Sequence, residues 1–120
     1  MPNVLFVDDF ETVLDFLSKF LRSKGYEVCC AESKNALDKS FLSFHPDIIL
    51  LDVRLNGEDG RMICKEIKSI IADIPVILIS ATATLLEDFK LCDANDIIKK
   101  PFDLELVLEK IEKALRTIPM

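Results

Sequence analysis

The sequence predicts a doubly wound α/β fold, in which five helices cover the two faces of a five-stranded parallel sheet. Short apolar runs alternate with longer amphipathic segments along the chain, an order typical of strand–helix units. Most of the apolar runs are continuous rather than alternating, as expected for strands that are buried on both faces. With 120 residues, the chain has the size of one domain. We therefore expect residues 1–120 to form a single domain, with no effector domain in this chain.

Each predicted strand is a short, mostly apolar run between polar or turn residues. The strands are expected at Asn3–Val7, Tyr26–Ala31, Ile48–Leu51, Val76–Ile79 and Asp96–Lys99. Pro46 and Pro75 each stand just before a strand, so neither marks a boundary between domains. A strand order of 2-1-3-4-5 is one of the common arrangements for this kind of sheet.

Apolar residues at helical spacing predict the first two helices. The first, Phe10–Ser23, ends before Gly25, and its buried stripe is expected to be Val13, Phe16, Leu17, Phe20 and Leu21. The second begins near Ser33, a suitable N-cap residue, and its stripe is expected to be Leu37, Phe41 and Phe44.

The same spacing predicts three further helices. The third follows Asp59-Gly60, with a stripe of Ile63, Ile67 and Ile70. Thr84 and Glu87 have the spacing of a capping box, which predicts a short fourth helix burying Leu85, Phe89 and Cys92. The last helix starts at Asp103 and has acids in its first turn and bases in its last, an arrangement that suits the helix dipole.

Composition narrows the possible functions. The formal net charge of −6 opposes direct binding to a nucleic-acid backbone. No apolar run approaches the ~20 residues of a membrane span, and the N-terminus lacks the pattern of a secretory signal, so we expect a cytoplasmic protein. The four cysteines have neither zinc-binding nor C-x-x-C spacing and are expected to be reduced, mostly buried thiols.

Reactive side chains follow four of the five predicted strands. Asp8 and Asp9 follow the first strand, Asp52 the third, Ser80 the fourth and Lys100 the fifth. In open α/β sheets, ligands bind outside the carboxyl ends of the strands, at the point where the strand order reverses. For the expected order, that point lies between the first and third strands. The three aspartates should therefore share one crevice.

Crowded carboxylates repel one another, and a bound cation relieves that repulsion. Oxygen ligands that leave room for water favour Mg²⁺ or Mn²⁺ over Ca²⁺. Such an ion also neutralises charge during phosphoryl transfer, for which Asp52 is the natural nucleophile. The Lys100 amine could reach a phosphoryl oxygen across the crevice, and Ser80 could donate a hydrogen bond to another.

The sequence resembles the response-regulator receiver domain of two-component signalling, from Asn3 to about Leu115. The matching motifs are Val7-Asp8-Asp9, Pro46-Asp47-Ile48-Ile49-Leu50-Leu51-Asp52, Asp59-Gly60, Ser80-Ala81 and Lys100-Pro101-Phe102. The resemblance implies a flavodoxin-like fold and a phosphorylation switch rather than a metabolic enzyme. The phosphoryl donor would be a sensor histidine kinase or a phosphotransfer protein.

The resemblance also implies a role for each site residue. Asp52 would be the phosphoacceptor, and Mg²⁺ would be held by Asp9, Asp52 and the backbone carbonyl of Arg54. Asp8 would act mainly through a metal-bound water. Ser80 and Lys100 would bind the phosphoryl group, and the Lys100-Pro101 peptide would be cis. The domain would be a monomer or a phosphorylation-dependent dimer.

The chain departs from the family pattern near the expected output surface. Ile97 replaces the usual aromatic residue, Asp93 a usual glycine, and Asn56 a common proline, and the interval from Ser80 to Lys100 is about two residues short. These changes leave a phosphorylation-independent interaction module open as an alternative. An aspartyl-phosphate hydrolase usually has an Asp-x-Asp pattern after its first strand, and a flavin-binding protein of similar fold needs a phosphate loop that is missing after Asp9.

Overall fold

A five-stranded parallel sheet forms the centre of the computed structural model, which describes residues 2–87 and 89–116. In spatial order, the strands are β2 (Glu27–Ala31), β1 (Asn3–Val7), β3 (Ile48–Asp52), β6 (Val76–Ser80) and β7 (Asp96–Lys99). Each neighbouring pair is parallel, so all five strands end at the same edge of the sheet. The predicted strands and their order are confirmed.

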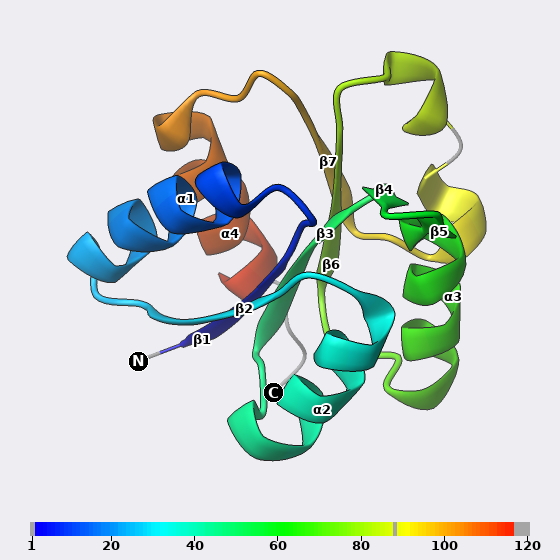
Figure 1. Cartoon of the computed structure of the whole chain (residues 1–120), viewed down its shortest axis with the longest axis horizontal. Coiled ribbons are helices and arrows are strands. Elements are labelled where there is room, and N and C mark those ends of the chain that lie inside the picture. The colour runs from blue at the N-terminus through cyan, green and yellow to red at the C-terminus, as the bar shows by residue number, and fades with distance from the viewer. Residues whose placement is uncertain (1, 88, 117–120) are drawn as a thin grey trace.

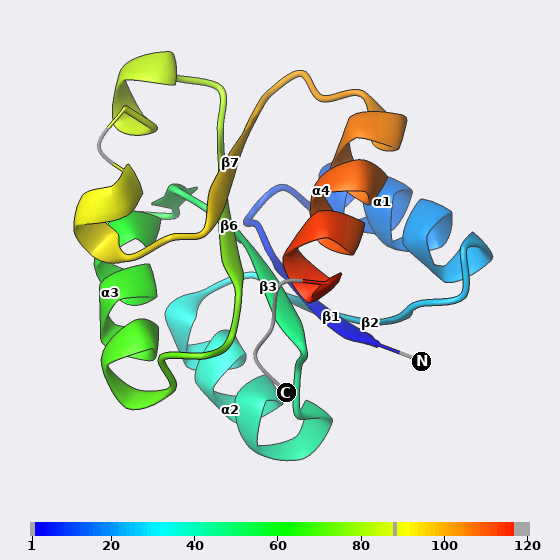
Figure 2. The same ribbon diagram turned by 180° about the vertical axis from the view of Figure 1, so that it is seen from behind.

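Four α-helices among the described residues cover the two faces of the sheet. Helices α1 (Glu11–Ser23) and α4 (Leu104–Arg116) lie on one face, and α2 (Lys34–Phe44) and α3 (Gly60–Ile70) on the other, as the opposite views in Figures 1 and 2 show. None of the helices formed by the described residues is long and apolar enough to cross a membrane.

Alternating side chains of the buried strands form two separate core layers. In β1, Leu5 and Val7 pack toward α2 and α3, whereas Val4 and Phe6 pack toward α1 and α4. Strands β3 and β6 divide in the same way, because successive strand residues point to opposite faces. This two-sided burial is the reason for the continuous apolar runs in the sequence.

Two predicted helix starts are confirmed by side-chain caps. The Ser33 hydroxyl accepts a hydrogen bond from the Ala36 N–H at the start of α2, and Asp59 accepts one from the Arg61 N–H at the start of α3. Each bond satisfies an N–H that has no partner within its helix.

The predicted fourth helix is wrong. Two 3₁₀-helices, η1 (Ala83–Leu85) and η2 (Phe89–Cys92), take its place, so the described residues form four α-helices rather than five. Leu86 and Cys92 are both buried in the core layer beside α3, although their spacing would put them on different faces of one α-helix. Burial of both side chains therefore favours a broken segment over a regular helix.

The predicted core stripes of α1 and α3 were partly wrong. The Phe16 side chain is 60% exposed and that of Ile70 is 77% exposed. Leu14 and Cys64 are buried in their place, each on the helix face that contacts the sheet. Apolar residues on both sides of each stripe made the helix phase ambiguous in the sequence.

Candidate functional site

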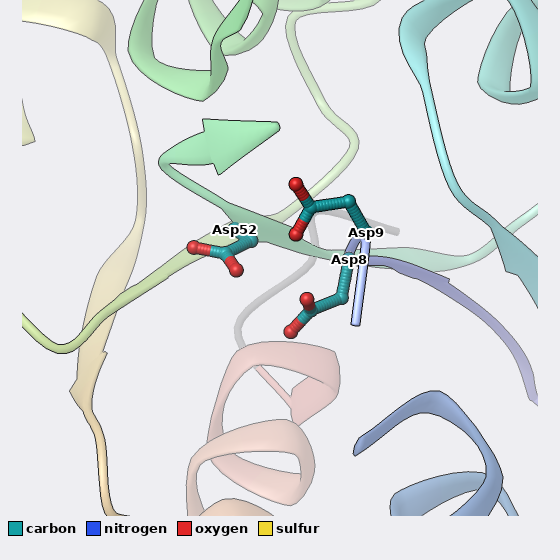
Figure 3. A group of neighbouring side chains, drawn as sticks. All are labelled: Asp8, Asp9 and Asp52. Carbon is teal, nitrogen blue, oxygen red and sulfur yellow. The ribbon is translucent and has the colours of Figure 1, made fainter. Parts of the chain in front are cut away.

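Three carboxylates meet at the carboxyl edge of the sheet. Asp8 and Asp9 directly follow β1, and Asp52 is the last residue of β3. Because Val7 pairs with Leu51 in the parallel register, the next residue of each strand carries a carboxylate. One oxygen from each of the three lies within 4.8 Å of the others, and Figure 3 shows the side chains around the ends of the two strands. The three aspartates therefore lie together, as predicted from the strand order.

The ammonium group of Lys100 bridges the two buried carboxylates. Its Nζ lies 2.8 Å from Asp8 Oδ2 and 3.0 Å from Asp52 Oδ2. Lys100 follows β7, and its N–H donates a hydrogen bond to the carbonyl oxygen of Ser80 at the end of β6. The Lys100-Pro101 peptide bond is cis, as predicted.

Burial and charge set the ionisation of this group. The pKa of the Asp52 carboxyl is raised to about 6, because burial, the largest cause, and the nearby Asp8 charge outweigh the hydrogen bond from Lys100. Burial lowers the pKa of the Lys100 ammonium, but its bonds to Asp8 and Asp52 outweigh burial, so this pKa is raised. At neutral pH, Asp52 is therefore mostly a carboxylate facing an ammonium ion.

Backbone N–H groups orient the carboxylates. The Phe10 N–H donates to Asp8 Oδ1 over 2.9 Å, and the Arg54 N–H donates to Asp52 Oδ1 over 3.3 Å. These bonds fix the carboxylates beside the strand ends from which they project. They also leave the opposite oxygens, both Oδ2 atoms, paired with Lys100.

Ser80 lies on the strand next to Asp52, and its hydroxyl is engaged by its own loop. Its side chain is buried, and its Oγ accepts a hydrogen bond from the Thr82 N–H over 3.0 Å. The structure thus brings Asp8, Asp9, Asp52 and Lys100 into one cluster, with Ser80 at the neighbouring strand end.

A small β-hairpin beside Asp9 was missed in the sequence. Strands β4 (Arg54–Leu55) and β5 (Glu58–Asp59) are antiparallel and joined by Asn56 and Gly57, which have φ values of 45° and 90°. The Asn56 N–H donates to Asp9 Oδ2 over 2.8 Å. An Asn-Gly pair is among the strongest sequence signals of a two-residue hairpin turn and could have revealed it.

The donor set suits a hard divalent cation. The cluster presents three carboxylates and only one ammonium group, so negative charge remains uncompensated. All the available donors are oxygens, the preference of Mg²⁺ and Mn²⁺. The exposure of Asp9 leaves one side of the cluster open to water.

An apolar hollow of about 430 Å³ borders the cluster at Lys100. It is lined by Phe10, Thr12, Val13, Phe16, Ala81, Lys100, Pro101 and Phe102. Phe10 and Phe16 are both about 60% exposed, unusual for large apolar side chains. This hollow gives an apolar surface directly beside the reactive groups.

The sequence matches one protein-family model and is similar to known regulatory proteins. Residues 4–112 match the family model described as the response regulator receiver domain. The chain is 37% identical over 118 residues to the uncharacterized transcriptional regulatory protein YvcP of Bacillus subtilis, covering 97% of this chain and 49% of that protein. It is 35% identical to the regulatory protein AtoC of Escherichia coli, covering 95% of this chain and 25% of that protein. The chain thus spans about half or less of these relatives.

Solved structures show the same fold. The receiver domain of NtrX from Brucella abortus has a TM-score of 0.89 and 28% identity, covering 95% of this chain and 98% of that one. The response regulator protein TrrA from Thermotoga maritima, crystallised in complex with Mg²⁺ and BeF, has a TM-score of 0.87 and 29% identity, covering 95% of this chain and 99% of that one.

Proposed function

Because this chain belongs to the response regulator receiver domain family, we propose that it is a phosphorylation switch in which Asp52 accepts a phosphoryl group. It is a signalling domain rather than a metabolic enzyme. The observation that carries the proposal is the position of the Asp52 carboxyl group at the edge of the sheet, beside two more carboxyl groups and the Lys100 amine.

In the proposed reaction, an Asp52 oxygen attacks the phosphorus atom of a phosphohistidine on a sensor kinase or phosphotransfer protein. A P–O bond forms to the carboxylate and the P–N bond breaks. The electron pair of the broken bond stays on the imidazole nitrogen, which takes up a proton. Lys100 would move from its partner carboxylates to an oxygen of the transferred group, as the compact charge of a lysine allows. The Ser80 hydroxyl would donate to another.

Asp9, Asp52 and the backbone carbonyl of Arg54 would hold a divalent cation, and Asp8 would act through a bound water. Mg²⁺ is the first candidate and Mn²⁺ the second, since both take oxygen donors. When bound, the cation supplies charge neutralisation for the transferring phosphoryl group. The neighbour TrrA, crystallised with Mg²⁺ and BeF, supports this assignment.

The phosphodonor would dock in the hollow beside Lys100. The exposed Phe10 and Phe16, together with Phe102, line the hollow and would offer apolar contacts to a partner helix that carries the phosphohistidine. The hollow borders Lys100, which in turn contacts Asp52. A donor seated there would therefore place its phosphoryl group close to the acceptor.

Phosphorylation would be read by a protein partner or by a further domain. The acidic charge of this chain argues against direct binding to nucleic acid. Two relatives carry names of regulators and are much longer than the matched segment. Residues 1–120 would act as a single receiver unit, either alone or within a longer protein, and phosphorylation could promote dimer formation.

Intact-mass spectrometry with a small phosphodonor tests the proposal. We expect a gain of one phosphoryl group that requires Mg²⁺ and is absent in Asp52→Asn, because this change removes the nucleophile at nearly constant volume. Circular dichroism should show that Asp52→Asn is folded. Asp47→Asn is the matched control, since Asp47 lies at the other end of β3 and should leave labelling unchanged. Equal labelling of the Asp52 variant would refute the assignment.

A further inference from the structure

One carboxylate of the acidic cluster, that of Asp9, makes no ion pair within the described part of the chain. Asp8 and Asp52 are buried and share the Lys100 ammonium, whereas Asp9 is exposed, and no ion pair joins it to any residue between 2 and 116 that the structure describes. Like charges this close repel one another, and the exposed side chain is the one free to turn toward solvent. An interaction that holds Asp9 in the cluster would oppose this repulsion.

The backbone N–H of Asn56 supplies that interaction. It donates to Asp9 Oδ2 over 2.8 Å, across 47 positions of sequence. A hydrogen bond from an amide to a carboxylate stabilises its charged form and fixes its direction. The donor is a backbone group, so its position depends on the conformation of the chain around it and not on the Asn56 side chain.

That conformation is a tight turn with two left-handed residues. Asn56 at φ 45° and Gly57 at φ 90° connect the paired residues Leu55 and Glu58. Asparagine tolerates this backbone better than most residues and glycine adopts it freely. A proline at position 56 could neither adopt φ 45° nor donate the hydrogen bond.

A second contact holds the far side of the hairpin. Glu58 Oε1 accepts a hydrogen bond from the Lys34 N–H, at the first residue of α2, over 3.1 Å. The hairpin therefore spans from Asp9 after β1 to the start of α2 and is anchored at both ends.

We propose that the Asn56-Gly57 turn is a positioning element of the metal site, whose Asn56 N–H presets Asp9 as a ligand and so raises the affinity for a divalent cation. The inference rests on the proposed function, because it takes Asp9 to be a ligand. Asn56 acts through Asp9 and is a positioning residue. Because the Asp9 carboxylate is already held in place, cation binding loses less conformational entropy in ordering it.

Calorimetric titration of the full chain with Mg²⁺ tests this role. Asn56→Pro removes the donor and should raise Kd roughly 10-fold, in line with outer contacts at metal sites. Gly57→Ala should raise it several-fold through backbone strain alone, because a methyl group there meets nothing within 4 Å. Asn56→Gly keeps both the N–H and the left-handed backbone, and its Kd should stay within about twofold of wild type.

A metal-free measurement keeps the test independent of binding. In the wild type, NMR hydrogen exchange should show a protected Asn56 amide, and Gly57→Ala should reduce that protection while the rest of the sheet stays protected. Wild-type affinity in both Asn56→Pro and Gly57→Ala, or weak binding by Asn56→Gly, overturns the inference. An unprotected Asn56 amide in a wild type that binds Mg²⁺ overturns only the positioning role. A wild type without Mg²⁺ binding overturns the proposed function as well.

Discussion

Gly60 lies directly against the backbone of Asp52. A methyl group added at Gly60 would come within 2.2 Å of the Asp52 carbonyl oxygen, so the chain must shift if any larger residue stands there. The Gly60 N–H also donates to the Val53 carbonyl over 2.6 Å, which holds the start of α3 against the loop after β3. Close packing of α3 on β3, the strand that ends at Asp52, therefore depends on a glycine.

Gly60→Ala should destabilise the protein by about 2 kcal/mol, because the clash is with backbone atoms that cannot rotate away. Urea unfolding measures the loss. Gly57→Ala is the control, since its added methyl is unobstructed and only its positive φ is strained, at a cost of about 1 kcal/mol. Equal stability of Gly60→Ala and wild type would contradict the close approach.

The sequence predicted the sheet and the acidic cluster because both depend on local patterns. Continuous apolar runs identified the strands, and parallel order then brought Asp8, Asp9 and Asp52 together. The broken segment near Leu86 could not be predicted, because the capping-box pattern is local whereas the burial that overrides it depends on contacts with α3. Asp93 also has a backbone that its own residue type does not predict: its φ of 66° is left-handed, and the family usually has glycine at this position.

Lys100→Met should destabilise the metal-free protein by roughly 2 kcal/mol, because Asp8 and Asp52 lose their shared partner. Added Mg²⁺ should recover part of that loss by supplying positive charge to the same carboxylates. Chemical unfolding with and without Mg²⁺ measures both effects. Lys99→Met, at the exposed neighbouring lysine, should unfold as the wild type does. A loss of the same size in both variants would argue against a special role for Lys100.

Arg54 should slow hydrolysis of the phosphorylated protein. It follows Asp52 by two positions, and its side chain is exposed at the edge of the site, where it can shield the phosphoryl group from attacking water. We expect Arg54→Ala to shorten the phosphoryl lifetime several-fold, as measured by mass spectrometry after the donor is removed. Arg22→Ala, distant in sequence on α1, serves as the charge-matched control. An unchanged decay rate in Arg54→Ala would exclude this role.

The buried thiol of Cys64 should resist alkylation in the folded protein. Burial, followed by the neighbouring Cys92, raises the pKa of this thiol to about 12, so almost none of it is thiolate at pH 8. Iodoacetamide should modify the exposed Cys30 first and reach Cys64 only in denaturant, as peptide mass mapping would show. Labelling should increase with pH. Rapid labelling of Cys64 in the native state would mean that α3 and η2 separate readily.

The segment Ala81–Leu91 should carry the response to phosphorylation. Its described residues form η1 and the start of η2, where the backbone bonds are of the short i to i+3 kind, such as Leu86 N–H to the Ala83 carbonyl. Position 88 lies outside the described residues. A segment with so few regular hydrogen bonds should open at lower cost than α3 or α4.

Ile97 cannot carry the response through a side-chain rotamer switch. The family commonly has an aromatic residue at this position that turns inward, but isoleucine has no ring, and its branched Cβ restricts χ1. Its side chain is already half-buried and packs on the core layer beside α3. Hydrogen exchange with and without a phosphoryl mimic and Mg²⁺ should therefore change most in Ala81–Leu91, and Ile97→Ala should leave that change largely intact. A response confined to the loop after Asp52, or one lost in Ile97→Ala, would show that the signal takes another route.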